Sequence, residues 1–157
     1  MATNADMDFA DGLDAWLRQV DVYVTLSADE RGQITAAGAQ AYAKVLKDMT
    51  PRSNVDYSKG KHGAGHATRH KHGHLADSVT YKAGYTADNL HTGDTDIGYQ
   101  DHYFDFLARL INDGQKEMSV KELANMHFTD RAQEAAKEQV FAAMKAKYNE
   151  LLGGGAE

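Results

Sequence analysis

Histidines gather in one glycine-rich stretch of this 157-residue chain, where their spacing resembles that of zinc ligands. A zinc-binding helix presents two histidines four residues apart, and a third ligand comes from elsewhere. His62, His66 and His70 have that spacing, whereas His70, His72 and His74 alternate as strand residues do. The glycines between them disfavour a helix, and no carboxylate follows within the segment. The sequence therefore predicts no metal site here, and these side chains gain charge as the pH falls towards about 6.5.

Four aspartates and one serine are the other candidates for chemistry. Asp94, Asp96, Asp101 and Asp105 would supply carboxylates to a hydrolytic metal centre. They fall in a turn and around a helix start, however, where aspartate is expected as a capping residue. Ser78 lies inside a predicted strand, and the sequence has neither a Gly-x-Ser-x-Gly elbow nor a glycine-rich phosphate loop. The sequence therefore predicts a protein that is not an enzyme and binds no cofactor.

The overall composition is that of a single globular domain, residues 1–157. Hydrophobic residues make up 42% and charged residues 25% of the chain, which are ordinary values. The absence of cysteine excludes disulfides and thiolate metal ligands. The first 16 residues are acidic without an apolar run, so no signal peptide is expected. No stretch approaches the length of about 18 apolar residues that a membrane span needs, so we expect a soluble, cytosolic product.

Charge is distributed unevenly between two segments. The formal net charge of −6 argues against broad affinity for nucleic acid, because phosphate binding needs a basic surface. Residues 1–26 carry an acidic face with Arg18 as the single base, whereas residues 59–74 contain no acid. These opposite biases suit a self-associating protein, a protein with an acidic partner, or two solvated segments, and all three interpretations remain open. The acidic face is Asp8, Asp11, Asp14 and Asp21, and the candidate interaction arm is Lys59, Lys61, His62, His66, Arg69, His70, Lys71, His72 and His74.

Two helices are expected in residues 1–50. Ser27 and Glu30 have capping-box spacing and predict the start of the second helix. Pro51 predicts its end, because proline disfavours helical geometry at Thr50. Gly38, which stands among alanines, indicates close packing against another helix. An amphipathic stripe with spacings of three and four predicts the first helix, and its members are Phe9, Leu13, Trp16, Leu17, Val20 and Val24.

The rest of the chain divides into a loop, a core and a tail. Residues 51–74 carry little to bury and predict a mobile loop rich in Gly, His and Lys. Alternating side chains predict strands over 75–85 and 95–99, joined as an antiparallel hairpin. Apolar spacing predicts a short helix over 104–111 and a long helix over 128–152, with a polar loop between them. The core is thus 75–152 and the tail 153–157.

These elements define an α+β fold class. We expect a small antiparallel β-sheet packed against long α-helices, with a long flexible arm. The turn Asn112-Asp113-Gly114 should end the short helix, because Gly114 takes a left-handed conformation without a Cβ penalty.

The order of elements from Leu75 to Leu151 resembles that of the head–tail joining, or tail-completion, minor morphogenesis proteins in the neck of long-tailed bacteriophages (siphophages). That family usually has an aromatic strand, an apolar helix ending in Asn/Glu-x-Gly-Thr, a short loop, and a Phe-led, Ala-rich helix. Gln115 stands where the family has threonine, and the loop here is longer. The matching residues are Leu75–Val79, Ile97–Tyr99, Phe106–Ala108, Asn112–Gly114, Met118 and His127–Phe128.

The resemblance implies a non-catalytic structural virion protein that forms a ring, of six copies, joining head to tail. Its implied partners are copies of itself and the adjacent neck and tail proteins. Genome DNA would pass through the ring without sequence-specific binding, and the acidic face would line the channel. The implied location is the virion neck, after assembly in the cytoplasm of the bacterial host and without membrane contact. An alternative remains open: a small nucleic-acid-binding accessory protein that uses the basic 59–74 arm.

Overall fold

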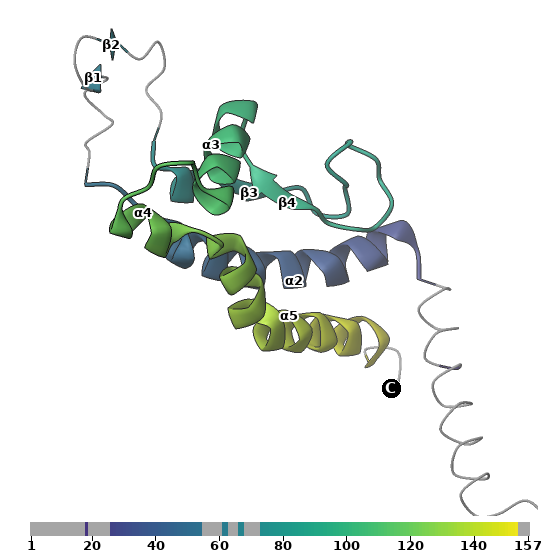
Figure 1. Ribbon diagram of the computed structural model, residues 1–157. Helices are drawn as coiled ribbons and strands as arrows, with labels where there is room; N and C mark the ends of the chain where they lie inside the picture. The colour runs from purple at the N-terminus through teal and green to yellow at the C-terminus, as the bar shows by residue number, and fades with distance from the viewer. Residues whose placement is uncertain (1–17, 19–25, 55–60, 63–65, 68–72, 154–157) are drawn as a thin grey trace, which may run out of the picture.

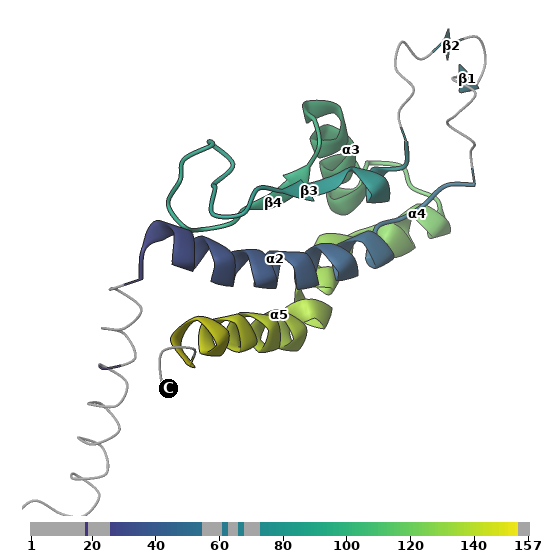
Figure 2. The same cartoon turned by 180° about the vertical axis from the view of Figure 1, so that it is seen from behind.

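The computed structural model describes residues 18, 26–54, 61–62, 66–67 and 73–153. Its long helix α2 (Ala28–Met49) lies between two layers, with α5 (Phe128–Gly153) on one side and the β3–β4 hairpin with α3 on the other (Figures 1 and 2). The α+β fold class is therefore confirmed. The expected first helix, with its apolar stripe and its aspartates, lies outside the described residues apart from Arg18, which is helical and exposed.

Helix α2 begins and ends where its sequence predicts. The Ser27 hydroxyl accepts from the Glu30 amide (3.2 Å), and the Glu30 carboxylate accepts from the Ser27 amide (2.8 Å), which completes the capping box. The helix ends at Met49, and Thr50 has extended backbone before Pro51. The Thr50 hydroxyl and the Thr50 amide both donate to the Leu46 carbonyl, so Thr50 alone caps the last turn of the helix.

Helices α2 and α5 pack closely and run antiparallel. A Cβ at Gly38 would lie 2.8 Å from Met144 Cγ and 3.2 Å from Val140 Cγ1, so the expected close contact at this glycine is confirmed. Further along, Ala132 and Ala136 of α5 are fully buried. Small residues at the contact between α2 and α5 let the two backbones approach closely. The neighbouring side chains then make more dispersion contacts. Ala135, between them in sequence, is exposed.

The β-sheet is smaller than the alternating pattern predicts. Residues Leu75–Ser78 form a 3₁₀ turn (η2), and only Val79–Tyr81 is a strand (β3). It pairs antiparallel with β4 (Ile97–Tyr99), in the register Val79 to Tyr99. The strand predicted over 75–85 was therefore too long, because Ser78 donates to the Leu75 carbonyl (2.7 Å) and closes a turn.

A chain of hydrogen bonds fixes the hairpin loop to α2. The Gly84 amide donates to Thr95 Oγ1 (2.9 Å), and the Thr95 and Thr35 hydroxyls share a bond (2.7 Å). Thr35 in turn donates to the Gly93 carbonyl (2.8 Å). Beside this chain, a Cβ at Gly32 would lie 2.9 Å from Gly84 Cα. The loop backbone thus lies directly on the helix backbone.

Helix α3 (His102–Asp113) covers the open side of the hairpin. Asp101 caps it by accepting from the Phe104 amide (3.1 Å), which is the capping role expected for aspartate here. Phe104 and Ala108 are buried against α2, β3 and the start of α5, in the main hydrophobic cluster. After α3, the short helix α4 (Val120–Asn125) occupies part of the stretch that the sequence predicted to be a polar loop.

Candidate interaction surface

Asn112 joins the end of α3 to the start of α5. Its carbonyl accepts from the His127 amide (3.0 Å). Its side-chain Oδ1 accepts from both the amide (3.2 Å) and the hydroxyl (2.6 Å) of Thr129. The side chain therefore serves as a cap for α5 from a distant part of the chain, so the predicted turn residue is also a tertiary link. Asp113 is exposed and accepts from Asn112 Nδ2 (3.2 Å).

Gly114 ends α3 with positive φ, as the sequence predicts, but not in the left-handed helical region. Its φ is 79° and its ψ is 177°, a combination that is essentially restricted to glycine. The Gly114 amide donates to the Leu110 carbonyl (3.1 Å), and the chain then turns away along an extended path. This path leads to Met118 and onward to α4.

Helix α4 is held by its ends and not by a buried face. Ser119 and Glu122 form a second capping box, with bonds of 3.3 Å and 2.7 Å. The hydrogen bonds from the Ser119 hydroxyl and then from its amide hold the pKa of Glu122 below its ordinary value. Arg131 of α5 donates to the Ala124 carbonyl (3.0 Å). No residue of this helix is buried, so its apolar side chains face outward.

Large apolar side chains are exposed along α3 and α4, and we call them the α3–α4 surface. Phe106 is 59% exposed and Val120 85% exposed. Exposed apolar residues are ordinary when scattered singly, and the four here stand on two helices that contact each other. The members of this surface are Tyr103, Phe106, Val120 and Leu123.

Two neighbouring hollows flank the contact between α3 and α4. They share Leu107, Ile111 and Asn125, and they have volumes of about 240 Å³ and 190 Å³. Tyr103 of the exposed surface lines the larger hollow, and Met118 lines the smaller one. The larger hollow is lined by polar as well as apolar residues, and the smaller one mainly by apolar residues. Exposed side chains beside such hollows give a relief into which a partner's side chains can insert.

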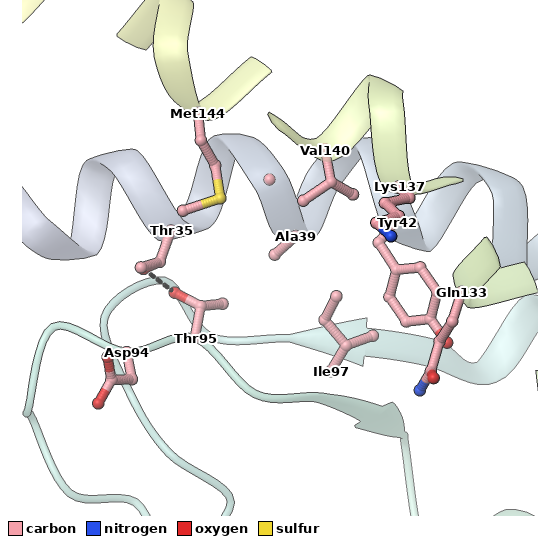
Figure 3. Close-up of a pocket in the computed structure, with 11 residues that line it drawn as sticks. Thr35, Ala39, Tyr42, Asp94, Thr95, Ile97, Gln133, Lys137, Val140 and Met144 are labelled. Atoms are coloured by element: carbon pink, nitrogen blue, oxygen red, sulfur yellow. Dashed lines mark hydrogen bonds between the residues drawn. The ribbon is translucent and has the colours of Figure 1, made fainter. Parts of the chain in front are cut away.

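A separate groove runs between α2, α5 and the residues before β4. Its volume is about 410 Å³, and its lining is mostly apolar. Ala39 of α2 lies between Val140 and Met144 of α5 on one side and Thr95 and Ile97 on the other (Figure 3). Asp94 and Lys137 are the charged residues of the lining, and Asp94 pairs with Arg31 (3.6 Å).

The predicted arm is described only in part. Lys61–His62 (β1) and His66–Ala67 (β2) pair antiparallel, with His62 opposite His66. His74 precedes η2 as a half-buried residue. The remaining arm residues, Lys59, Arg69, His70, Lys71 and His72, and the acidic face Asp8, Asp11, Asp14 and Asp21 lie outside the described residues.

The four candidate aspartates are separated by structural roles. Asp94 pairs with Arg31 (3.6 Å), and Asp96 accepts from the Ala87 amide (2.8 Å). Asp101 caps α3, as described above, while Asp105 lies one turn later. Within the described part of the chain, no group of three His, Asp or Glu side chains could hold a metal ion.

Sequence reasoning missed two features of this region. Helix α4 carries the Ser-x-x-Glu signature of a capping box at Ser119 and Glu122, which could have revealed it. The contact between Gly32 and Gly84 has no such local signal, because the two glycines come together only through the hairpin loop.

No family model, no curated protein and no solved structure matches this chain. Among the helices of the described residues, none combines the length and the apolar character required to cross a membrane.

Proposed function

We propose that this protein is a non-catalytic structural component of a long-tailed bacteriophage. In this proposal it forms a homo-oligomeric ring of six copies in the neck and joins head to tail. The number of copies and the place in the neck come from the family resemblance of residues 75–151. Each copy contacts its neighbours in the ring and the adjacent neck and tail proteins. DNA passes through the ring.

The α3–α4 surface is the observation that carries the proposal. It exposes Phe106 and Val120 within the stretch that resembles the phage family. In the ring, this surface contacts the neighbouring copy, and a head-to-tail contact joins it to a different patch of that copy. The β3–β4 sheet offers a further site, since each strand pairs with only one other strand among the described residues.

The test is electron microscopy of particles assembled with the normal protein or with a Phe106→Glu variant. When this protein carries an electron-dense label, we expect the label at the head–tail junction of the particles. With the Phe106→Glu variant we expect unjoined heads and tails. The matched control is Gln40→Glu, which introduces the same side chain at an exposed site on α2. The purified protein's mass in solution, measured alongside, shows whether the ring closes alone or only on a partner ring. Label elsewhere on the particle, or normal particles with Phe106→Glu, would reject the proposal.

A further inference from the structure

We propose that the hairpin loop of one copy, residues 82–96, docks in the hollow at the end of α2 of a second copy, with Leu90 as its anchor. This inference rests on the proposed ring, because it names the patch that the neighbouring copy contributes to the contact. The hollow is the larger of the two beside α4, and Tyr103 of the α3–α4 surface lines it.

Leu90 is an apolar side chain that a hydrogen-bonded turn holds in solvent. Its side chain is 59% exposed. Its carbonyl accepts from the amides of Thr86 (3.0 Å) and Thr92 (3.1 Å), and its amide donates to the Thr86 hydroxyl (3.3 Å). Asn89 beside it has a positive φ of 60°, and its amide donates to the Thr86 carbonyl (2.9 Å). A turn that is already ordered loses little conformational entropy on binding, so Leu90 is suited to insertion into a partner.

The hollow can take a leucine side chain. Its volume is about 240 Å³, and its apolar lining includes Leu75, Phe104, Leu107 and Ile111. Leu75 and Phe104 are buried parts of the main hydrophobic cluster, so the hollow opens directly onto the core. Insertion of Leu90 would remove apolar surface from water on both copies, which favours association.

The two patches carry opposite charge. The charged residues that line the hollow are Arg52, His74 and Lys121, and no described residue of its lining is acidic. Arg52 pairs with Asp77 (3.0 Å), whereas Lys121 is exposed on α4. Opposite charges at two surfaces steer and orient their docking. Around the loop, carboxylates outnumber basic groups, with Asp29, Asp88, Asp94 and Asp96 exposed against Arg31 and Lys82.

The two patches lie at opposite ends of α2 (Figures 1 and 2). Asp94 of the loop pairs with Arg31 in the first turn (3.6 Å), and Pro51 and Arg52 line the hollow just after the last turn. Helix α2 has 22 residues, which at about 1.5 Å per residue separates the patches by about 30 Å. When the loop of one copy fills the hollow of the next, each copy keeps one unused patch. The contact is therefore heterologous, and repetition closes it into a ring or extends it into a filament.

Two introduced cysteines test the contact in the full-length protein, which has none of its own. Ala87→Cys lies in the loop and Ala124→Cys lies on α4 beside the hollow; both sites are exposed, and the docking residues stay intact. A short bismaleimide cannot join them within one chain, because they lie at opposite ends of α2. Applied to the purified protein and to assembled particles, it should give a ladder of oligomers whose largest member counts the copies in the ring. Gln139→Cys, exposed on α5, should give no ladder when it replaces Ala124→Cys.

Leu90→Asn in the protein with both cysteines should lower the yield of cross-linked oligomers about tenfold, because it removes the anchor. Leu152→Asn makes the same change at a 41% exposed site on α5 and should leave the yield unchanged. A ladder that withstands Leu90→Asn, a product that stops at dimers, or no ladder in either preparation would overturn the proposal.

The position of the label in electron microscopy tests the proposed function separately. A ladder without label at the head–tail junction would keep this contact and reject the role in the phage neck. Label at the junction without a ladder would keep that role and reject this contact.

Discussion

Gly114 is constrained by its backbone and by its neighbours at once. Its dihedral angles, φ 79° and ψ 177°, belong to a region that residues with a Cβ avoid. A Cβ there would lie 2.8 Å from Met118 Sδ and 2.9 Å from Met126 Cε. The methionines could move, but the backbone could not change without moving the path to α4. The dihedral constraint is therefore the stronger one.

Gly114→Val should reduce the free energy of unfolding by a few kcal/mol, because a β-branched side chain is forced to positive φ. Gly98→Val is the control, since Gly98 lies in β4 with open space around a Cβ. Chemical denaturation measures both. A Gly114→Val protein as stable as the parent would show that the turn adopts another conformation.

Tyr99 links stability to alkaline pH. Burial raises the pKa of Tyr99 from 10.0 to about 12, and its hydroxyl is a buried polar atom without a hydrogen-bond partner among the described residues. The unfolded chain therefore loses this proton first. The contribution of Tyr99 to stability is complete below pH 10 and is lost as the pH rises towards 12. The loss between pH 9 and pH 11 should be about 1 kcal/mol.

Urea unfolding of the parent and of Tyr99→Phe at pH 9 and pH 11 tests this linkage. The parent should lose more stability than the variant over that interval. Tyr42, whose pKa burial also raises, is present in both proteins and cancels in the comparison. If the stability of both proteins showed the same pH dependence, the pKa of Tyr99 would be the same in the folded and the unfolded state.

At the scale of elements, α2 organises the molecule through glycines that face different neighbours. Gly32 faces the backbone of the hairpin loop at Gly84, whereas Gly38 faces the side chain of Met144. A backbone fixed by the Thr35–Thr95 hydrogen bonds cannot yield, but a methionine side chain can rotate. Two glycines in one helix therefore differ in what they tolerate.

Gly32→Ala should destabilise the protein by about 1–3 kcal/mol, since the new methyl group meets backbone. Gly38→Ala should be near neutral, because the gain in helix propensity of about 1 kcal/mol offsets the movement of Met144. Thermal or urea unfolding of the two variants makes the comparison. If Gly32→Ala proves the more stable of the pair, the close approach of the loop to α2 is not maintained in solution.

At the scale of the whole molecule, two separate surfaces carry exposed or half-buried apolar side chains. The α3–α4 surface lies at one end of the hairpin layer, and the groove lies between α2 and α5 (Figures 1 and 3). In our proposed function the first surface binds a neighbouring copy.

The net charge of −6 leads to a prediction about DNA. In an electrophoretic mobility-shift assay at physiological salt, the purified protein should not slow the migration of linear DNA. Non-specific binding requires basic groups that neutralise the phosphates, and this protein is acidic overall. The control replaces Lys59, Lys61, Arg69 and Lys71 by alanine and should behave as the parent does. Salt-dependent retention that this replacement abolishes would favour the nucleic-acid-binding alternative over the ring.

The sequence alone determined the limits of several helices. Helix α2 begins at the capping box of Ser27 and Glu30 and ends at Thr50, before Pro51. Helix α3 ends at the turn Asn112-Asp113-Gly114. These signals are reliable because a cap satisfies backbone groups within three or four residues of itself. Helix α4 was missed although its capping box was present, since it lacks the apolar stripe that marks a buried helix.

Only the tertiary structure decided the extent of the sheet, the docking of the hairpin loop and the surfaces. The strand pattern over 75–85 could not reveal that η2 replaces its first four residues. The position of Gly84 on Gly32 depends on hydrogen bonds between residues about sixty apart. Exposure of Phe106, beside the buried Phe104, likewise depends on which side of α3 the hairpin and α2 cover. Contacts distant in sequence leave no local pattern, because their energy depends on where other elements pack.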